Sequence, residues 1–331
     1  MFGHRVFVIV FAIAVSGCST PSASVPSPGI AHSAASTDGA FQIPPGYLYV
    51  SANTGLLVYA GTKLKFLRNA GGTQPAGLAV DGVKQVYNAD TASANVRIFS
   101  PGAAGTVRTL SRHLVSPTNI ALSSNGDAYV VASDATVAMF VNATNKKSRT
   151  VKKLSQPVVA VDASGNAYVG SGNTIYVLPP RSTKPIRTIG GLNGVVSEAF
   201  DASGNLYVGN AAGSGTGGSV SVFAPGASTP SYSITNGIDR PGALAFDSHE
   251  DLYVANELAG TSGDVTEYVP GSMTPRATVT SYVDDPTSIC LDSNDNLYVA
   301  DAGTHNVTVY AVKSFVLDQE VPTKGDPTNV L

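Results

Sequence analysis

The stretch that decides the fold is Asp201 to Asn210, which reads DASGNLYVGN. Its pattern, an Asp, a Ser-Gly-Asn turn and a tyrosine between apolar residues, recurs along the chain at spacings of 38 to 46 residues. A repeat of about 40 residues that is built from short strands predicts a β-propeller. The tyrosines that anchor the copies are Tyr49, Tyr87, Tyr129, Tyr168, Tyr207, Tyr253 and Tyr298.

Each copy predicts four strands, named a to d from the centre of the ring outwards. Strand a precedes the Asp and alternates large and small residues, as in Leu78, Ala79 and Val80, which suits the crowded centre. Cys290 occupies one of the small-residue positions, so we interpret it as a packing residue. The Asp-x-Ser-Gly-Asn segment predicts the a–b hairpin turn, because Asp and Asn bond to nearby backbone and Gly accepts a positive φ. A calcium loop is the alternative interpretation, although no downstream Glu completes its ligand shell.

The two ends of the repeat array predict how the ring closes. The first copy lacks strand a, and residues 326–331, DPTNVL, resemble the strand-a segments at 116–122 and 285–291. We therefore expect an all-β, seven-bladed β-propeller of four-stranded antiparallel blades, closed by pairing of the C-terminal strand with the N-terminal blade. The alternative is a six-bladed ring with a disordered C-terminal tail.

The beginning of the chain predicts an export signal. Residues 6–15 are apolar but too short to span a bilayer, and Val15-Ser16-Gly17-Cys18 resembles the bacterial lipobox. We expect residues 1–17 to be a lipoprotein signal peptide and 18–44 to be the lipidated Cys18 with a flexible Ser/Pro/Ala tether. The propeller domain would then be 45–331, at the outer membrane, cell surface or periplasm. Cys290 would have no cysteine partner within the mature propeller.

The bulk composition excludes some partners. The formal net charge is −3 and only 13% of residues are charged, so no nucleic-acid footprint is expected. We expect a monomer whose contact with the membrane is the lipid anchor alone.

The repeats also resemble a known group of propellers. The patterns P-x-x-I-A-x-D, G-N-L-Y-V-A-D and V-x-V-Y-A-P-G are similar to those of NHL-repeat and SMP-30/gluconolactonase-like propellers, over residues 45–331. The resemblance implies the architecture and leaves the activity open, because such propellers include binding scaffolds, lactonases, lyases and signalling ectodomains.

Candidate site residues lie where strands a and b approach the mouth of the central channel. Glu198 replaces an apolar residue of strand a, so we expect it to pair with Arg240 or His305 or to line a ligand site. Glu198 and His305 are the catalytic candidates. Ligand-binding candidates lie three residues after the tyrosines, where turn chemistry is the alternative explanation: Asp90, Asn210, Asn256 and Asp301.

These features predict a lipid-anchored envelope propeller that binds a protein, peptide or glycan without catalysis. The alternative is a metal-assisted lactonase or lyase at the channel mouth, using Glu198, Asp301, Asn256 and His305. No cofactor is expected for the first function, and a divalent metal would serve the second. The sequence has no three-ligand zinc pattern, nucleophile elbow or P-loop.

Overall fold

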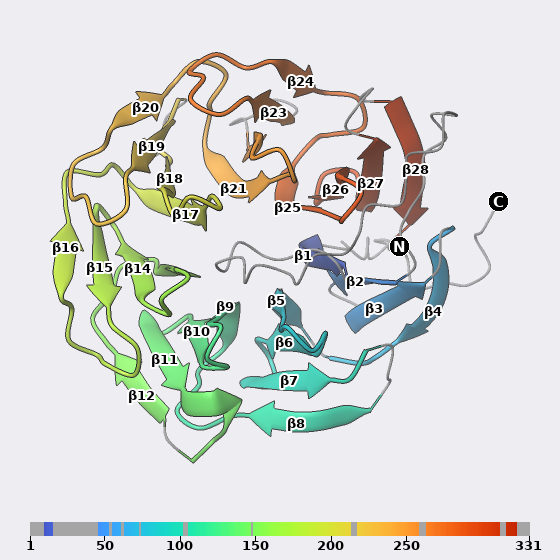
Figure 1. Ribbon diagram of the computed structural model, residues 1–331. Coiled ribbons are helices and arrows are strands. Elements are labelled where there is room, and N and C mark those ends of the chain that lie inside the picture. Colours follow the sequence, from blue (N-terminus) through green and yellow to red (C-terminus); the bar gives the residue numbers. More distant parts are fainter. Residues whose placement is uncertain are drawn as a thin grey trace, which may run out of the picture.

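The protein is described by a computed structural model, over residues 10–15, 46–52, 55–60, 63–72, 74–101, 105–146, 148–212, 217–257, 263–311 and 316–322. Seven four-stranded antiparallel sheets form a ring (Figure 1), which confirms the predicted seven-bladed propeller. One short 3-10 helix, η1 (Val141–Ala143), interrupts the strands of the described part. No helix among the described residues is long and apolar enough to cross a membrane.

Each blade uses four consecutive strands, and the first of them is innermost. Blades 1 to 3 comprise β1 (Val10–Val15), β2 (Tyr47–Ala52), β3 (Gly55–Ala60), β4 (Lys65–Asn69); β5 (Pro75–Val80), β6 (Val86–Asp90), β7 (Asn95–Phe99), β8 (Thr106–Leu110); and β9 (Pro117–Leu122), β10 (Ala128–Ala132), β11 (Thr136–Phe140), β12 (Ser148–Val151). Blades 4 and 5 comprise β13 (Val158–Val161), β14 (Ala167–Ser171), β15 (Thr174–Leu178), β16 (Arg187–Ile189); and β17 (Val195–Phe200), β18 (Leu206–Asn210), β19 (Ser219–Phe223), β20 (Tyr232–Ile234). Blades 6 and 7 comprise β21 (Pro241–Phe246), β22 (Leu252–Asn256), β23 (Asp264–Tyr268), β24 (Ala277–Val279); and β25 (Pro286–Leu291), β26 (Asn296–Asp301), β27 (Asn306–Ala311), β28 (Val316–Pro322).

The repeated Asp makes the a–b turn as predicted. In blade 5 the Asp201 carbonyl accepts the Gly204 N–H at 3.0 Å, and its carboxylate accepts the backbone N–H and the side-chain amide of Asn205 at 2.7 and 2.6 Å. Gly204 has a φ of +80°, which a residue with a Cβ adopts at a cost. The carboxylate is therefore used in holding the hairpin closed.

The hydrophobic core lies between successive blades. Seven clusters of buried side chains in the described residues fill the seven gaps, and the anchoring tyrosines are all buried. Cys290 is buried in the cluster between blades 7 and 1, which agrees with a packing role. Because every blade buries both faces against neighbours, the stability of each blade depends on the closure of the ring.

The inner strand of blade 1 differs from the expectation. The predicted strand, residues 327–331, lies outside the described residues. The partner of β2 is instead β1, with Ile13 opposite Val50 and Val15 opposite Leu48, and β1 also contacts the inner strands of blades 7 and 2. The physical reason is that the inner edge of β2 presents unpaired backbone groups, which any apolar extended segment of suitable length can satisfy. The chain with its N-terminal residues still attached supplies such a segment, VFAIAV.

Candidate functional site

The mouth of the channel is built by the d–a and b–c loops. Strand a runs away from this face and strand b returns to it, so the starts of the a strands and the ends of the b strands gather there. The four predicted ligand-binding residues occupy the last position of strand b in their blades, at β6, β18, β22 and β26. The topology thus puts them at the same level of four different blades.

These four side chains accept hydrogen bonds from the d–a loop that leads into strand a of their own blade. Asp90 accepts the Gln74 N–H at 3.3 Å, and Asn210 accepts the Asn193 N–H at 3.3 Å. Asn256 accepts the Asp239 N–H at 3.1 Å. Such bonds fix the loops that shape the mouth, as the turn-chemistry interpretation expects. Their role as ligand-binding residues stays a prediction.

Blade 7 and blade 4 use the same device. Asp301 accepts the N–H groups of Asp284 and Asp285 at 2.7 and 3.2 Å, and that of Thr304 at 2.7 Å. Ser171, the last residue of β14, accepts the Ser155 N–H at 2.8 Å. His305 lies in the turn between β26 and β27 with a left-handed φ of 60°.

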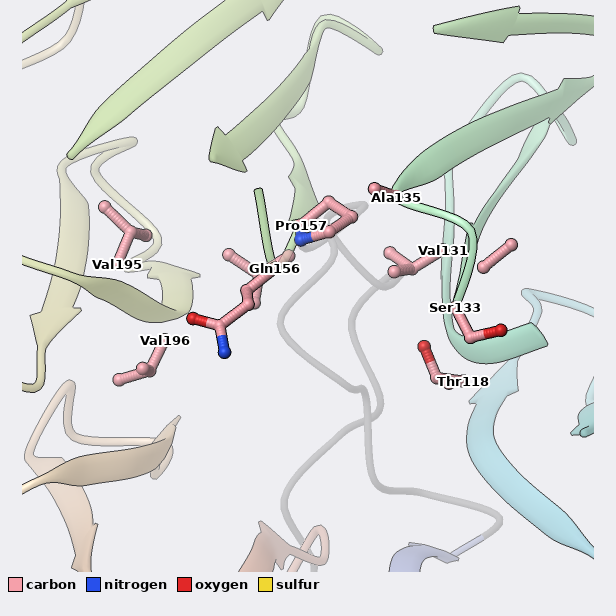
Figure 2. Close-up of a pocket in the computed structure, with 10 residues that line it drawn as sticks. Thr118, Val131, Ser133, Ala135, Gln156, Pro157, Val195 and Val196 are labelled. Carbon is pink, nitrogen blue, oxygen red and sulfur yellow. The ribbon is translucent and has the colours of Figure 1, made fainter. Parts of the chain in front are cut away.

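A cavity of about 430 Å³ opens on this face beside the start of β13. Its lining comes from blades 3, 4 and 5 and contains no charged residue. Figure 2 shows Gln156 and Val196 on one side of the cavity, with Thr118 and Ser133 on the other. The full lining is Thr118, Val131, Ala132, Ser133, Ala135, Gln156, Pro157, Val158, Val195 and Val196. Sequence reasoning missed this site, since short apolar residues at loop ends carry no motif.

The backbone at the cavity is held in an uncommon conformation. Gln156 has a φ of +44° and directly precedes Pro157; Ser116 and Arg240 also precede prolines, with φ of +45° and +49°. Non-glycine residues adopt this region at a cost that the surrounding structure must offset. The packing and hydrogen bonds around these d–a loops must therefore support the backbone conformation from which the Gln156 side chain projects.

Glu198 lies in β17, in the gap between blades 4 and 5, and is 8% exposed. Neither carboxyl oxygen has a hydrogen-bond partner among the described residues. Burial raises the pKa of Glu198 well above its usual value. The backbone N–H of Ala160 lowers this pKa only in part, because it forms no hydrogen bond of normal geometry to the Glu198 carboxyl group. The raised pKa favours the protonated, uncharged form of this carboxyl group.

A glycine makes room for this carboxyl group. A Cβ at position 170 would lie 2.7 Å from Glu198 Oε1, 2.6 Å from Val158 Cγ2 and 2.8 Å from Val195 Cγ1. Both valines line the cavity. Glu198 thus lies directly behind the apolar wall of the mouth cavity, rather than on its surface.

The prediction that Glu198 pairs with Arg240 or His305 was wrong. Arg240 lies in the loop before β21, where its Nη2 pairs with Glu257 Oε2 at 3.7 Å. His305 belongs to blade 7, and neither residue contacts Glu198, whose side chain faces blade 4. The register of β17 explains this, because Ser197, facing the other way, donates to the Pro241 carbonyl at 2.6 Å, whereas Glu198 points to β13 and β14.

A second carboxylate at an apolar position escaped the sequence analysis. Glu267 lies opposite Tyr253, whereas the other blades place apolar residues opposite the anchoring tyrosine, such as Ile98 and Val309. It accepts the Tyr253 hydroxyl at 2.7 Å and pairs with Arg276, which also pairs with Asp251 at 2.7 Å. The comparison that singled out Glu198 would have found Glu267.

Asp247, Asp251 and Glu267 bring one oxygen each to within 4.8 Å of one another, at the a–b turn side of blade 6. Of the described His, Cys, Asp and Glu residues, these form the group with the closeness that a metal requires, and neither Glu198 nor His305 belongs to it. The Arg276 guanidinium supplies positive charge to this group, and the Glu267 bond raises the pKa of Arg276 further. The arrangement acts as an ion-pair network that joins β23 to the residues directly before β22 and β24.

Comparison with known families agrees with the architecture. The NHL-repeat family matches residues 284–310, which span β25, β26 and most of β27 in blade 7. No curated protein matches the chain significantly. The chain is therefore a seven-bladed β-propeller with an NHL repeat in its last blade. Folds of this kind serve both binding modules and enzymes.

Proposed function

We propose that this propeller is a non-catalytic binding module, or scaffold, for a protein, peptide or glycan of the cell envelope. The observation that carries the proposal is the cavity at the channel mouth, whose volume of about 430 Å³ falls in the range of ligand sites. Its lining combines apolar side chains with the hydroxyls of Thr118 and Ser133 and the amide of Gln156. Such groups contribute packing and hydrogen bonds, and the function needs no cofactor.

The hydrogen bonds between the last residues of the b strands and the d–a loops support the same function. Asp90, Asn210, Asn256 and Asp301 orient loops through backbone N–H groups, and fixed loops preorganise a recognition surface. The sequence pattern at Cys18 further supports an exported lipoprotein at the outer membrane, cell surface or periplasm. In this proposal the lipid anchor is the contact with the membrane, and the mouth is left for the partner.

Capture from solubilised envelopes tests the binding function. The wild-type protein should retain a discrete protein or glycan, and Val196→Trp, which fills the cavity, should lose it. Val196 is 36% exposed, whereas Val83 is 72% exposed in the a–b turn of blade 2, on the other face. Val83→Trp is thus a matched control and should capture normally. Failure to retain any partner would contradict the proposal, as would lactone hydrolysis that a chelator abolishes.

Substitution of Cys18 tests the lipid anchor separately. Cys18→Ala should leave the propeller folded, because a Ser/Pro/Ala-rich tether buries too little apolar surface to contribute to a core. It should abolish lipidation, so the protein either leaves the membrane fraction or remains unprocessed. Fractionation with and without detergent measures this, with the melting temperature as the control for folding. Normal processing and unchanged membrane partition would refute lipidation at Cys18.

A further inference from the structure

The mouth face carries opposite charges on opposite sides of the ring. The cavity lies within blades 3 to 5, and the d–a loops next to it, 111–116 and 152–157, contribute Arg112, Lys152 and Lys153. All three are exposed. Asp134, in the b–c turn of blade 3, is a carboxylate of this side, and it accepts the Thr136 hydroxyl at 2.6 Å. This side, which we call the basic arc, therefore surrounds a neutral cavity with cations.

The loops of blades 6 and 7 form an acidic arc on the same face. The described residues of the d–a and b–c loops and of the adjoining strand ends, at 235–240, 257, 263–264, 280–285 and 301–305, contain one arginine, Arg240, one histidine, His305, and no lysine. Figure 1 places blades 6 and 7 across the ring from blades 3 and 4. The carboxylates of the acidic arc are Asp239, Glu257, Asp264, Asp284, Asp285 and Asp301.

These carboxylates repel one another. Desolvation raises the pKa of Asp285, and the neighbouring Asp301 and Asp284 raise it further. Burial raises the pKa of Glu257, which Arg240 lowers in part and Asp285 raises again. Burial also raises the pKa of Asp264, with repulsion from Asp239. The negative charge of the arc therefore exceeds what Arg240 compensates, and a bound cation would relieve it.

We propose that the mouth binds an extended polypeptide segment that places an apolar residue in the cavity, acidic residues over the basic arc and basic residues over the acidic arc. This inference rests on the proposed binding function and names its partner class. Charge complementarity across an interface orients the partner and suppresses wrong ones. The lining adds neutral partners for peptide groups, from Thr118, Ser133 and Gln156.

A polypeptide fits these features better than a glycan does. The cavity offers valines and a proline for packing and no aromatic side chain on which a sugar ring could stack. A segment of 11 extended residues reaches about 36 Å, and the probe peptide below is therefore made 11 residues long. An anionic glycan would engage the basic arc alone.

Fluorescent peptides and anisotropy test the inference on the full chain. The probe is EEGSVASGKKK, and its comparison peptides replace the lysines by serines, the glutamates by serines, or the valine by glycine. The probe should bind about tenfold more tightly than the serine-for-lysine peptide, from three exposed charge contacts. Asp284→Asn with Asp285→Asn, both exposed acids, should remove that preference without moving the melting temperature.

Charge reversal on the other arc completes the design. Lys152→Glu with Lys153→Glu should weaken the probe several-fold, whereas Lys184→Glu, in the exposed c–d turn of blade 4, should not. Equal affinity for the probe and the serine-for-lysine peptide, or a preference that survives Asp284→Asn with Asp285→Asn, would overturn the inference. So would capture of an anionic glycan that depends on Lys152 alone. If one of these results is obtained but Val196-dependent capture of a partner persists, the binding function is supported and the polypeptide class of the partner is wrong. If capture fails as well, both the binding function and the partner class are wrong.

Discussion

Deletion of residues 325–331 from a chain that starts at Cys18 is expected to lower its melting temperature markedly. Such a chain lacks Val10–Val15, the strand that pairs with β2 in the full chain, as the proposed processing before Cys18 would leave it. We expect the C-terminal segment to take that position in the processed protein. Val330 and Leu331 would then lose burial worth about 1.5–3 kcal/mol each, so the melting temperature should fall by about 5–10 °C.

The same deletion should have little effect while the N-terminal segment is attached. In that chain β1 already pairs with the inner edge of β2 and contacts the inner strands of blades 7 and 2. Four chains, 1–331, 1–324, 18–331 and 18–324, made by cell-free synthesis, form the comparison by thermal unfolding. A smaller deletion effect in the longer pair means that both segments compete for one position.

The contradicting results are equally distinct. Equal melting temperatures for 18–331 and 18–324 would mean that the C-terminal segment does not close the ring. An equal loss in both pairs would mean that the segment stabilises the protein somewhere other than beside β2. Aggregation of 18–324 alone would agree with an exposed inner edge.

Glu198→Leu is the second change with a large expected effect, and it should stabilise the protein at pH 7–8. Leu78 and Leu244 occupy the equivalent position in blades 2 and 6 and are buried there. Leucine removes a buried polar group that has no hydrogen-bond partner. A buried polar group without a hydrogen-bond partner costs about 1–3 kcal/mol, so the leucine variant should be more stable by about that amount.

The effect of Glu198→Leu should depend on pH in a defined direction. The folded pKa of Glu198 is raised above its unfolded value of about 4.3, so the folded protein binds this proton more tightly than the unfolded chain. The contribution of Glu198 to stability is full below pH of about 4.3 and is lost as pH rises towards the folded pKa. The advantage of the leucine variant should therefore be largest at alkaline pH and shrink on acidification.

Glu198→Gln separates ionisation from packing. It keeps the shape of the side chain and its unpaired polar atoms but has no proton to lose, so it should flatten the pH profile with a smaller gain than leucine. Urea unfolding at several pH values measures all three proteins. A leucine variant less stable than wild type at pH 8 would show that Glu198 has a stabilising partner. Loss of envelope capture in a stable Glu198→Leu protein would make it a ligand-site residue instead.

The fold could be predicted because each blade repeats the same local physics. The Asp, Gly and Asn of the a–b turn and the alternation in strand a are local signals, and the structure places them as expected, for instance at Asp201 and Gly204. The inner strand of blade 1 could not be predicted in this way. It depends on which of two apolar segments reaches the edge of β2, and that is a competition rather than a pattern.

The candidate site was predictable only in part. Glu198 stood out because the other blades have apolar residues at its position, but its burial without a partner depends on Gly170 and on the direction in which β17 faces. Asp90 and its counterparts lie at the ends of the b strands, which their spacing from the tyrosines predicts, while their bonds to the d–a loops needed the geometry. The cavity arises from gaps between blades, which no single repeat encodes.

Site-specific photocross-linking tests the central claim, that recognition takes place at the channel mouth, most directly. A photoreactive phenylalanine analogue at Val196, beside the cavity, would be compared in intact cells with the same group at Val83 on the other face. We expect a discrete cross-linked species from position 196 and none of that size from position 83. The same species from position 83 with none from position 196 would place the partner elsewhere and contradict the account.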